Sequence, residues 1–228
     1  KHKKLAIKKL IDPEEIKKSK QLPFRYVTAF ESVIGNRQFS DAISEAMDIA
    51  VSNTPELNGD ILIAVDSSGS MSGDPIKKAS IFAATLLKAN PKAEVILYDT
   101  KIKTLALSGR TPVIDLAKNI ESQAMGGGTQ TSLVFDYAIH TQKKYSRIII
   151  ISDNESWNDH SVQSAYQSYR KINDPYVYAI DIQGYGTKDI TGSKVSHLTG
   201  WSDRLLDFIG QSEKGDTLVK YIKNYKKE

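Results

Sequence analysis

The chain has 228 residues, of which 40% are hydrophobic and 25% are charged, as in a globular protein made of one large domain or one domain with an appendage. It contains no cysteine, which excludes disulfide frameworks and thiol catalysis and favours an intracellular compartment. No apolar stretch approaches the roughly 20 residues of a membrane span, so we expect no membrane partner. The net charge of +4 comes from residues 1–20, where eight lysines stand against three acidic residues. Such a run indicates either a polyanionic partner, RNA or DNA, or a solvated helix face.

Residues 1–58 show helical periods only. A capping aspartate, a proline and two glutamates at 12–15 predict the start of one helix ahead of Ile16. Pro23 begins a second predicted helix, and a third follows with its apolar stripe between residues 39 and 50. Residues 55–59 form a polar, turn-rich joint. We therefore predict a helical segment over 1–58 and a second unit over 59–228.

From residue 60 onward, predicted strands alternate with predicted helices. The strands span 60–65, 94–98, 104–107, 147–152, 176–181 and 194–198. The helices span 75–89, 113–123, 132–143, 161–172, 204–208 and 217–225. Several strands are almost continuous apolar runs, as in a parallel sheet that helices cover on both faces.

The connection at 99–101 is too short for a crossover helix, so the strands on either side of it should be antiparallel. The pattern as a whole predicts an α/β fold. Its centre is a doubly wound, mostly parallel six-stranded sheet with one antiparallel edge strand.

Oxygen-bearing side chains come to the carboxyl edge of this sheet from three segments, because the carboxyl ends of parallel strands lie together. These candidate metal ligands are Asp66, Ser68 and Ser70 after the first strand, Thr129 after the glycines at 126–128, and Asp153 after the strand at 147–152. Thr131 is the alternative to Thr129, which we prefer because it directly follows the glycines. Carboxylates and hydroxyls suit Mg²⁺, or else Mn²⁺ or Ca²⁺, rather than zinc. These ligands are too few for a closed cage, so the ion would keep a position open for an acidic oxygen from outside.

Two further residues of the third loop, Glu155 and Trp157, are placed at the rim of the ligand site, with packing as the alternative role of Trp157. A catalytic interpretation has little support. The four histidines have no partner in a motif, and the glycines at 126–128 lack the lysine of a phosphate-binding loop. We therefore expect a binding module rather than an enzyme.

The ligand set Asp66-x-Ser68-x-Ser70, Thr129 and Asp153 resembles the metal-ion-dependent adhesion site (MIDAS) of von Willebrand factor A (vWA) domains. The stretch 12–26, which contains Leu22-Pro23-Phe24-Arg25, resembles the end of the helical-repeat ring in Ro autoantigen (TROVE) proteins, where a vWA-like domain follows. The resemblance covers essentially the whole chain. It implies that the chain holds the vWA-like domain and the last helices of the ring, and that most of the ring is absent.

The Ro resemblance also implies partners and a location. In that family the ring binds small non-coding Y RNAs and the ends of misfolded RNAs, and bacterial members are tied to RNA quality control through an exoribonuclease. It implies a cytoplasmic protein, non-coding RNA as a partner of the full-length protein, and a protein partner with an acidic residue at the metal site. Lys17, Lys18, Lys20 and Arg25 are the candidate RNA contacts.

An extracellular adhesion domain that captures an acidic ligand residue through a divalent cation is the alternative, since the metal loops fit it equally well. The basic helices and the Leu22–Arg25 stretch argue against it. Because the chain begins at Lys1 rather than Met, the lack of a signal peptide at this end excludes no compartment.

Overall fold

The structure is a computed structural model that describes residues 2–153, 162–186, 188–200 and 204–213. Within these ranges, a six-stranded sheet has the order β3-β2-β1-β4-β5-β6. The strands are β1 (Ile61–Asp66), β2 (Glu94–Tyr98), β3 (Ile102–Thr104), β4 (Arg147–Ser152), β5 (Tyr176–Asp181) and β6 (Val195–Thr199). Neighbouring strands are parallel except β2 and β3, which are antiparallel. This arrangement confirms the predicted sheet.

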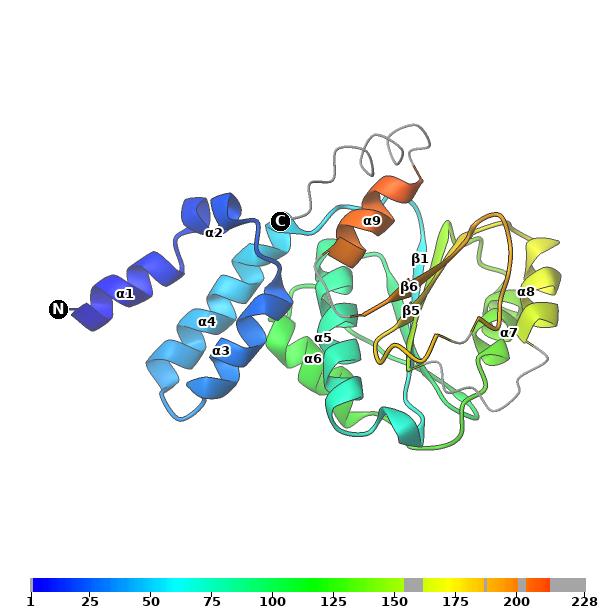
Figure 1. Ribbon diagram of the computed structural model, residues 1–228, viewed down its shortest axis with the longest axis horizontal. Coiled ribbons are helices and arrows are strands. Elements are labelled where there is room, and N and C mark those ends of the chain that lie inside the picture. The colour runs from blue at the N-terminus through cyan, green and yellow to red at the C-terminus, as the bar shows by residue number, and fades with distance from the viewer. Residues whose placement is uncertain (1, 154–161, 187, 201–203, 214–228) are drawn as a thin grey trace.

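Helices precede the sheet and then alternate with its strands (Figure 1). The amino-terminal segment holds α1 (His2–Leu10), α2 (Pro13–Ser19), α3 (Val27–Ser32) and α4 (Arg37–Ala50), with 3₁₀ turns η1 (Pro23–Tyr26) and η2 (Val51–Asn53). The sheet unit adds η3 (Gly69–Met71), α5 (Asp74–Ala89), α6 (Val113–Ser122), α7 (Ser132–Thr141), α8 (Val162–Arg170) and α9 (Arg204–Ser212). The predicted helix at 217–225 lies outside the described residues. No helix in the described part of the chain is long and apolar enough to cross a bilayer.

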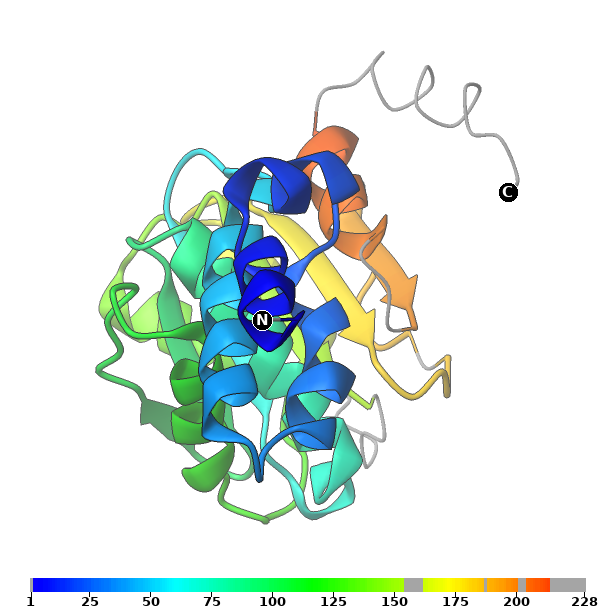
Figure 2. The ribbon, with the colours of Figure 1, turned by 90° about the vertical axis from the view of Figure 1, so that its left-hand side faces the viewer.

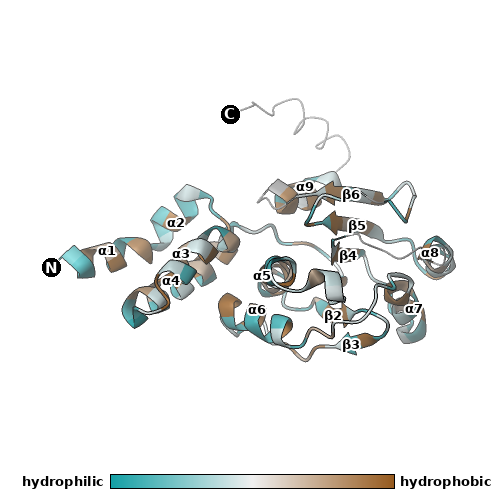
Figure 3. Ribbon diagram, turned by 60° about the horizontal axis from the view of Figure 1, so that its bottom comes forward, coloured by the Kyte–Doolittle hydropathy of each residue, from teal (hydrophilic) through white to brown (hydrophobic). Residues whose placement is uncertain are grey.

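The sheet separates two apolar layers. Helices α5, α6 and α9 lie on one face, and α7 and α8 lie on the other (Figure 3). All six residues of β1 are buried, because alternate side chains enter opposite layers. Ile63 and Val65 belong to the α5 side, whereas Leu62 and Ala64 belong to the α7 side. The continuous apolar run of β1 therefore follows from its place in the centre of the sheet.

The amino-terminal helices pack on the outside of α5 and α6, as Figures 1 and 2 show. Phe24 of η1 stacks on Phe82 of α5 with 6.2 Å between ring centroids. Met47 of α4 is fully buried in the same apolar layer. Asp48 accepts a hydrogen bond from Val113 N at the start of α6 (2.9 Å). The helical segment and the sheet unit thus share one core, and the boundary at residues 58 and 59 stays a prediction.

Three predicted elements differ from the structure by more than two residues at one end. One of them is the helix predicted at 204–208, which continues to Ser212 as α9. The edge strand spans 102–104 instead of 104–107, because the tight turn at 99–101 places Ile102 directly opposite Tyr98. Pro23 begins a 3₁₀ turn, and the α-helix starts only at Val27, since Leu22 at the cap position has no side-chain acceptor for the first N–H groups. By contrast, the helix predicted at 12–15 is confirmed, since the Asp12 carboxylate accepts hydrogen bonds from the first-turn N–H groups.

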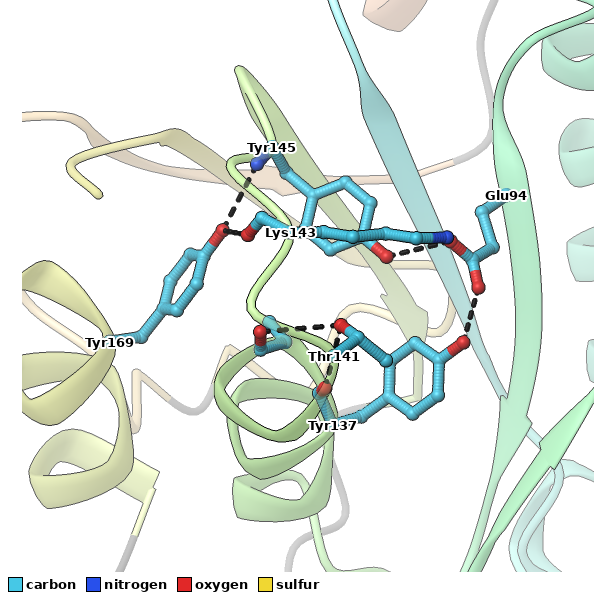
Figure 4. A network of polar contacts seen from close by, with 7 residues as sticks. Glu94, Tyr137, Thr141, Lys143, Tyr145 and Tyr169 are labelled. Carbon is cyan, nitrogen blue, oxygen red and sulfur yellow. Dashed lines mark hydrogen bonds and ion pairs between the residues drawn. The ribbon is translucent and has the colours of Figure 1, made fainter. Parts of the chain in front are cut away.

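A carboxylate network joins the amino-terminal end of β2 to α7 and to the segment that precedes β4 (Figure 4). Glu94 accepts hydrogen bonds from the hydroxyls of Tyr137 and Tyr145 and from the ammonium group of Lys143. Burial disfavours the charge of Glu94, but these donors outweigh burial and hold the pKa of its carboxyl below the usual value. Tyr169 adds a hydrogen bond to Lys143 O (2.6 Å). The network fixes the segment between α7 and β4. It lies at the amino-terminal ends of the strands, whereas the predicted metal ligands lie at the carboxyl ends.

Candidate metal site

Asp66 is the last residue of β1 and lies between β2 and β4, fully buried. Its carboxylate is held on both sides. Oδ1 accepts a hydrogen bond from Ser68 N (2.9 Å), and Oδ2 accepts one from the Ser152 hydroxyl (2.7 Å). These bonds fix the orientation of the carboxylate.

The first loop brings two hydroxyls next to this carboxylate. After Asp66 the chain turns through η3, and the hydroxyls of Ser68 and Ser70 come within 3.2 Å of each other. Ser68 is buried and Ser70 is exposed, so the pair extends from the interior to the surface. The three oxygens that the sequence predicts for this loop are thus brought together.

The glycine-rich second loop runs along the first. Gly126 N donates to Ser67 O, and Gly69 N donates to Gly127 O, both at 2.8 Å. Gly126 has a φ of +80°, a conformation that favours glycine. Thr129, which is half-buried, follows two residues after Gly127. The structure therefore places the loop that carries Thr129 directly against the loop that carries Ser68 and Ser70.

Thr131, the alternative ligand, is buried at the start of α7. Its side chain lies near the hydroxyl of Tyr98, a fully buried residue of β2 in register with Asp66. That hydroxyl forms no well-aligned hydrogen bond with any residue that the structure describes. The hydroxyl faces the side chains of Thr131 and Ser152 without a well-aligned bond to either, and a bound water is the kind of group that would complete it.

Asp153 directly follows β4 and is buried beside Asp66. Burial raises the pKa of Asp66 to about 6, against the lowering effect of the hydrogen bonds from Ser152 and Ser68, and the charge of Asp153 raises it further. No ion pair joins Asp66 to Lys or Arg in the described parts of the chain. A divalent cation would compensate this buried negative charge. The two rim residues, Glu155 and Trp157, lie outside the described residues.

The donor set fits a hard cation. In the described ranges, no three His, Cys, Asp or Glu side chains form a cluster that could hold a metal. The candidate site instead combines two carboxylates with hydroxyls, which suits Mg²⁺ with several retained waters and does not suit zinc. His197, the only histidine within the described strands, is held by a contact of its Nε2 with Ile190 O (2.7 Å).

Two buried aspartates at this edge were not predicted as site residues, although both sit at the ends of predicted strands. Asp181 ends β5 and accepts hydrogen bonds from Gln183 N, Gly184 N and Gly186 N, so it holds the loop that follows. Asp99 follows β2 and accepts a hydrogen bond from Gly127 N (3.0 Å). An aspartate at the end of a predicted strand therefore predicts a residue at this end of the sheet, but it does not predict which loop the carboxylate binds.

The candidate RNA contacts lie elsewhere. Lys17, Lys18 and Lys20 are exposed at the end of α2, and Arg25 is exposed in η1. None of the three lysines forms an ion pair with a described residue. Helices α1 and α2 lie beyond α4, at the end of the molecule away from α7 and α8 (Figure 1). The structure does not bring these basic residues together with the metal ligands.

Comparison with solved structures shows the same fold in the Ro (RSR) protein of Deinococcus radiodurans. The TM-score is 0.77 at 18% identity, and the match covers 92% of this chain and 48% of that one. This chain thus spans about half the length of that protein. Weaker matches are an aerotolerance-related membrane protein of Bacteroides fragilis (TM-score 0.42, 17% identity, 72% and 94% covered) and proximal thread matrix protein 1 of the mussel byssus (TM-score 0.46, 14% identity, 80% and 52% covered).

A search of curated proteins gave no match. The sequence profile described as the Ro60 vWA domain matches residues 60–176, a little over half of the chain. The matched range begins just before β1 and ends at the start of β5, so it contains all the candidate metal ligands. The chain therefore belongs to the Ro60 vWA domain family.

Proposed function

We propose that this chain is a cation-dependent binding module. A divalent cation, Mg²⁺ in the first place and Mn²⁺ or Ca²⁺ as alternatives, would be held by Asp66, Ser68, Ser70, Thr129 and Asp153. The observation that carries the proposal is the pair of buried carboxylates, Asp66 and Asp153, beside converging hydroxyls at one edge of the sheet. Burial disfavours the charge of Asp66, and the charge of Asp153 disfavours it further, so a cation beside Asp66 would be favourable.

The bound ion would supply a positive centre that the protein neutralises only in part, and that centre would attract a carboxylate from a protein partner. The chain's own residues prepare the site. Ser152 and Ser68 N hold the Asp66 carboxylate, and the glycine loop lies against the first loop. We propose binding and no catalysis, because these groups orient an ion and offer no nucleophile paired with a general base.

Within the longer protein, we propose that this module belongs to a cytoplasmic Ro-like ribonucleoprotein that binds small non-coding RNA, such as Y RNA, and serves RNA quality control. Membership of the Ro60 vWA domain family and the exposed lysines of α2 support this proposal. The partner with the acidic residue would then be a protein of RNA metabolism, such as an exoribonuclease.

A calorimetric titration with Mg²⁺ and Mn²⁺ tests the cation site. We expect one site with a Kd between micromolar and millimolar. Ser70→Ala should weaken it because a ligand oxygen is removed, whereas Ser72→Ala, an exposed serine two residues along the same loop, should leave it unchanged. The absence of saturable binding to the wild-type chain, or equal affinity in Ser70→Ala, would contradict the proposed site.

A second experiment tests the basic helices. Changing Lys17, Lys18 and Lys20 to glutamine should weaken the binding of a single-stranded RNA oligonucleotide and flatten its salt dependence. The slope of log K against log salt should change by about 0.7 for each phosphate that the protein no longer neutralises. The control changes the same charge at exposed lysines of the sheet unit, Lys77, Lys92 and Lys144. If both triple variants bind RNA alike, the lysines of α2 are an ordinary solvated face.

A further inference from the structure

Asp99 directly follows β2 and is 2% exposed. One of its carboxylate oxygens has an ordinary role, since Oδ1 accepts a hydrogen bond from Lys101 N (2.9 Å) within the turn between β2 and β3. The other oxygen makes a contact that the turn does not need. Oδ2 accepts a hydrogen bond from Gly127 N (3.0 Å), 28 residues further along the chain. The two oxygens of this buried carboxylate therefore hold two different segments.

The main chain of Asp99 holds the same loop at a second point, because its carbonyl oxygen accepts a hydrogen bond from Gln130 N (2.9 Å). Residues 127 and 130 are thus both bonded to Asp99, and Thr129 lies between them. Two fixed ends leave so short a segment few conformations, so Asp99 restricts the position of the Thr129 hydroxyl.

The first loop is connected to the same point. Gly127 O accepts a hydrogen bond from Gly69 N (2.8 Å), and Gly69 stands between Ser68 and Ser70. Gly127 therefore donates its N–H to the Asp99 carboxylate, and its carbonyl oxygen accepts from Gly69 N of the first loop. This close approach requires glycine, because a Cβ at position 127 would lie 2.4 Å from Asp99 Oδ2.

We propose that Asp99 is a positioning residue of the cation site, which sets the second loop, and Thr129 with it, against the first loop. Asp99 would not touch the ion. The inference rests on the proposed function, and it goes beyond it by assigning a role to a residue outside the ligand motif. Asp99 would act like the hydrogen-bonding groups that orient the ligands of other metal sites. Removing such a group typically weakens metal affinity about 10- to 100-fold.

Asp99→Asn separates the two roles of the side chain. Its single amide oxygen can still accept from Lys101 N, which preserves the turn, but its NH₂ group then faces Gly127 N–H, donor against donor. We expect Mg²⁺ affinity to fall about 10- to 100-fold and the amide hydrogen of Gly127 to exchange faster in the ion-free protein. Glu94→Gln, which alters a hydrogen-bonded carboxylate at the other end of β2, is the matched control and should leave both measurements unchanged.

A double-mutant cycle approaches the same contact from the other loop. Gly127→Ala should reduce Mg²⁺ affinity because its methyl group meets the Asp99 carboxylate. In an Asp99→Ala background the methyl group has room, so the second substitution should cost little further affinity. Independent, additive losses would overturn the inference, as would wild-type affinity in Asp99→Asn. If the wild-type chain binds no Mg²⁺, the proposed function itself fails; wild-type binding with an unaffected Asp99→Asn variant removes only the role of Asp99.

Discussion

Asp66→Asn is expected to abolish Mg²⁺ binding and, at the same time, to stabilise the ion-free fold. The carboxylate is fully buried and has no ion-pair partner among the described residues, so its charge costs free energy when no cation is present. Asparagine has the same shape, and its amide can accept from Ser68 N and donate to the Ser152 oxygen. We expect a gain of about 1–3 kcal/mol in the free energy of unfolding at pH 7 without metal.

The same substitution should remove a pH dependence. Burial raises the pKa of Asp66 to about 6 from an ordinary value of 3.8, so the folded state binds the proton more tightly than the unfolded state. The ion-free wild-type protein should therefore lose the stability contributed by the protonated group as the pH rises from about 4 through the folded-state pKa of about 6, and the change should level off about one pH unit above that pKa. Urea unfolding across this range, with a chelator present, measures the effect.

A saturating cation should reverse the order of stability. At a Mg²⁺ concentration of about 1,000 times the Kd, the wild-type chain should gain about 4.1 kcal/mol, more than the expected advantage of Asp66→Asn, and Asp66→Asn should gain nothing. Asp74→Asn changes an exposed carboxylate at the start of α5 and is the control for a general charge effect. A variant at Asp66 that still binds Mg²⁺ with wild-type affinity would place the ion elsewhere.

Arg147→Ala is expected to produce the largest loss of stability, about 3–5 kcal/mol, because it leaves the partly buried carboxylate of Glu213 without its charged partner. Arg147 begins β4 and is 7% exposed. Its guanidinium group pairs with both carboxylate oxygens of Glu213, just after α9, and donates to Asn58 O in the connection that leads into β1. The Tyr178 hydroxyl donates to Glu213 as well (3.0 Å). This one side chain therefore ties α9 and the connection before β1 to β4.

Urea unfolding of Arg147→Ala measures that loss. The double variant Arg147→Met/Glu213→Leu should cost less than the single substitution, since it leaves no unpaired charge in the interior. Arg147 lies at the edge of the sheet opposite to the metal ligands, so Mg²⁺ affinity below the unfolding transition should stay at the wild-type value. A loss below about 1 kcal/mol would mean that solvent compensates Glu213 when Arg147 is absent.

The class of fold and most of its elements could be predicted from the sequence, for a local reason. The apolar runs of β1, β4 and β5 and the helical periods between them depend on residues close in the chain, and the short turn at 99–101 required an antiparallel pair. The ligands of the first loop could also be predicted from the sequence, because parallel strands place their carboxyl ends at the same end of the sheet. The hydroxyls of Ser68 and Ser70 do lie together beside Asp66.

Which distant groups meet could be learned only from the folded arrangement. The sequence shows Asp99 as a turn residue. Its hydrogen bond to Gly127 exists only because β2 lies next to β1 and the glycine loop contacts the residues that follow both strands. Likewise, Arg147 and Glu213 are 66 residues apart, and no pattern in either segment predicts that they form an ion pair. The start of the second helix at Val27 instead of Pro23 is a smaller example. Periodicity reports which face of an element is buried, whereas hydrogen bonds between loops depend on strand order and on how the packed layers approach each other.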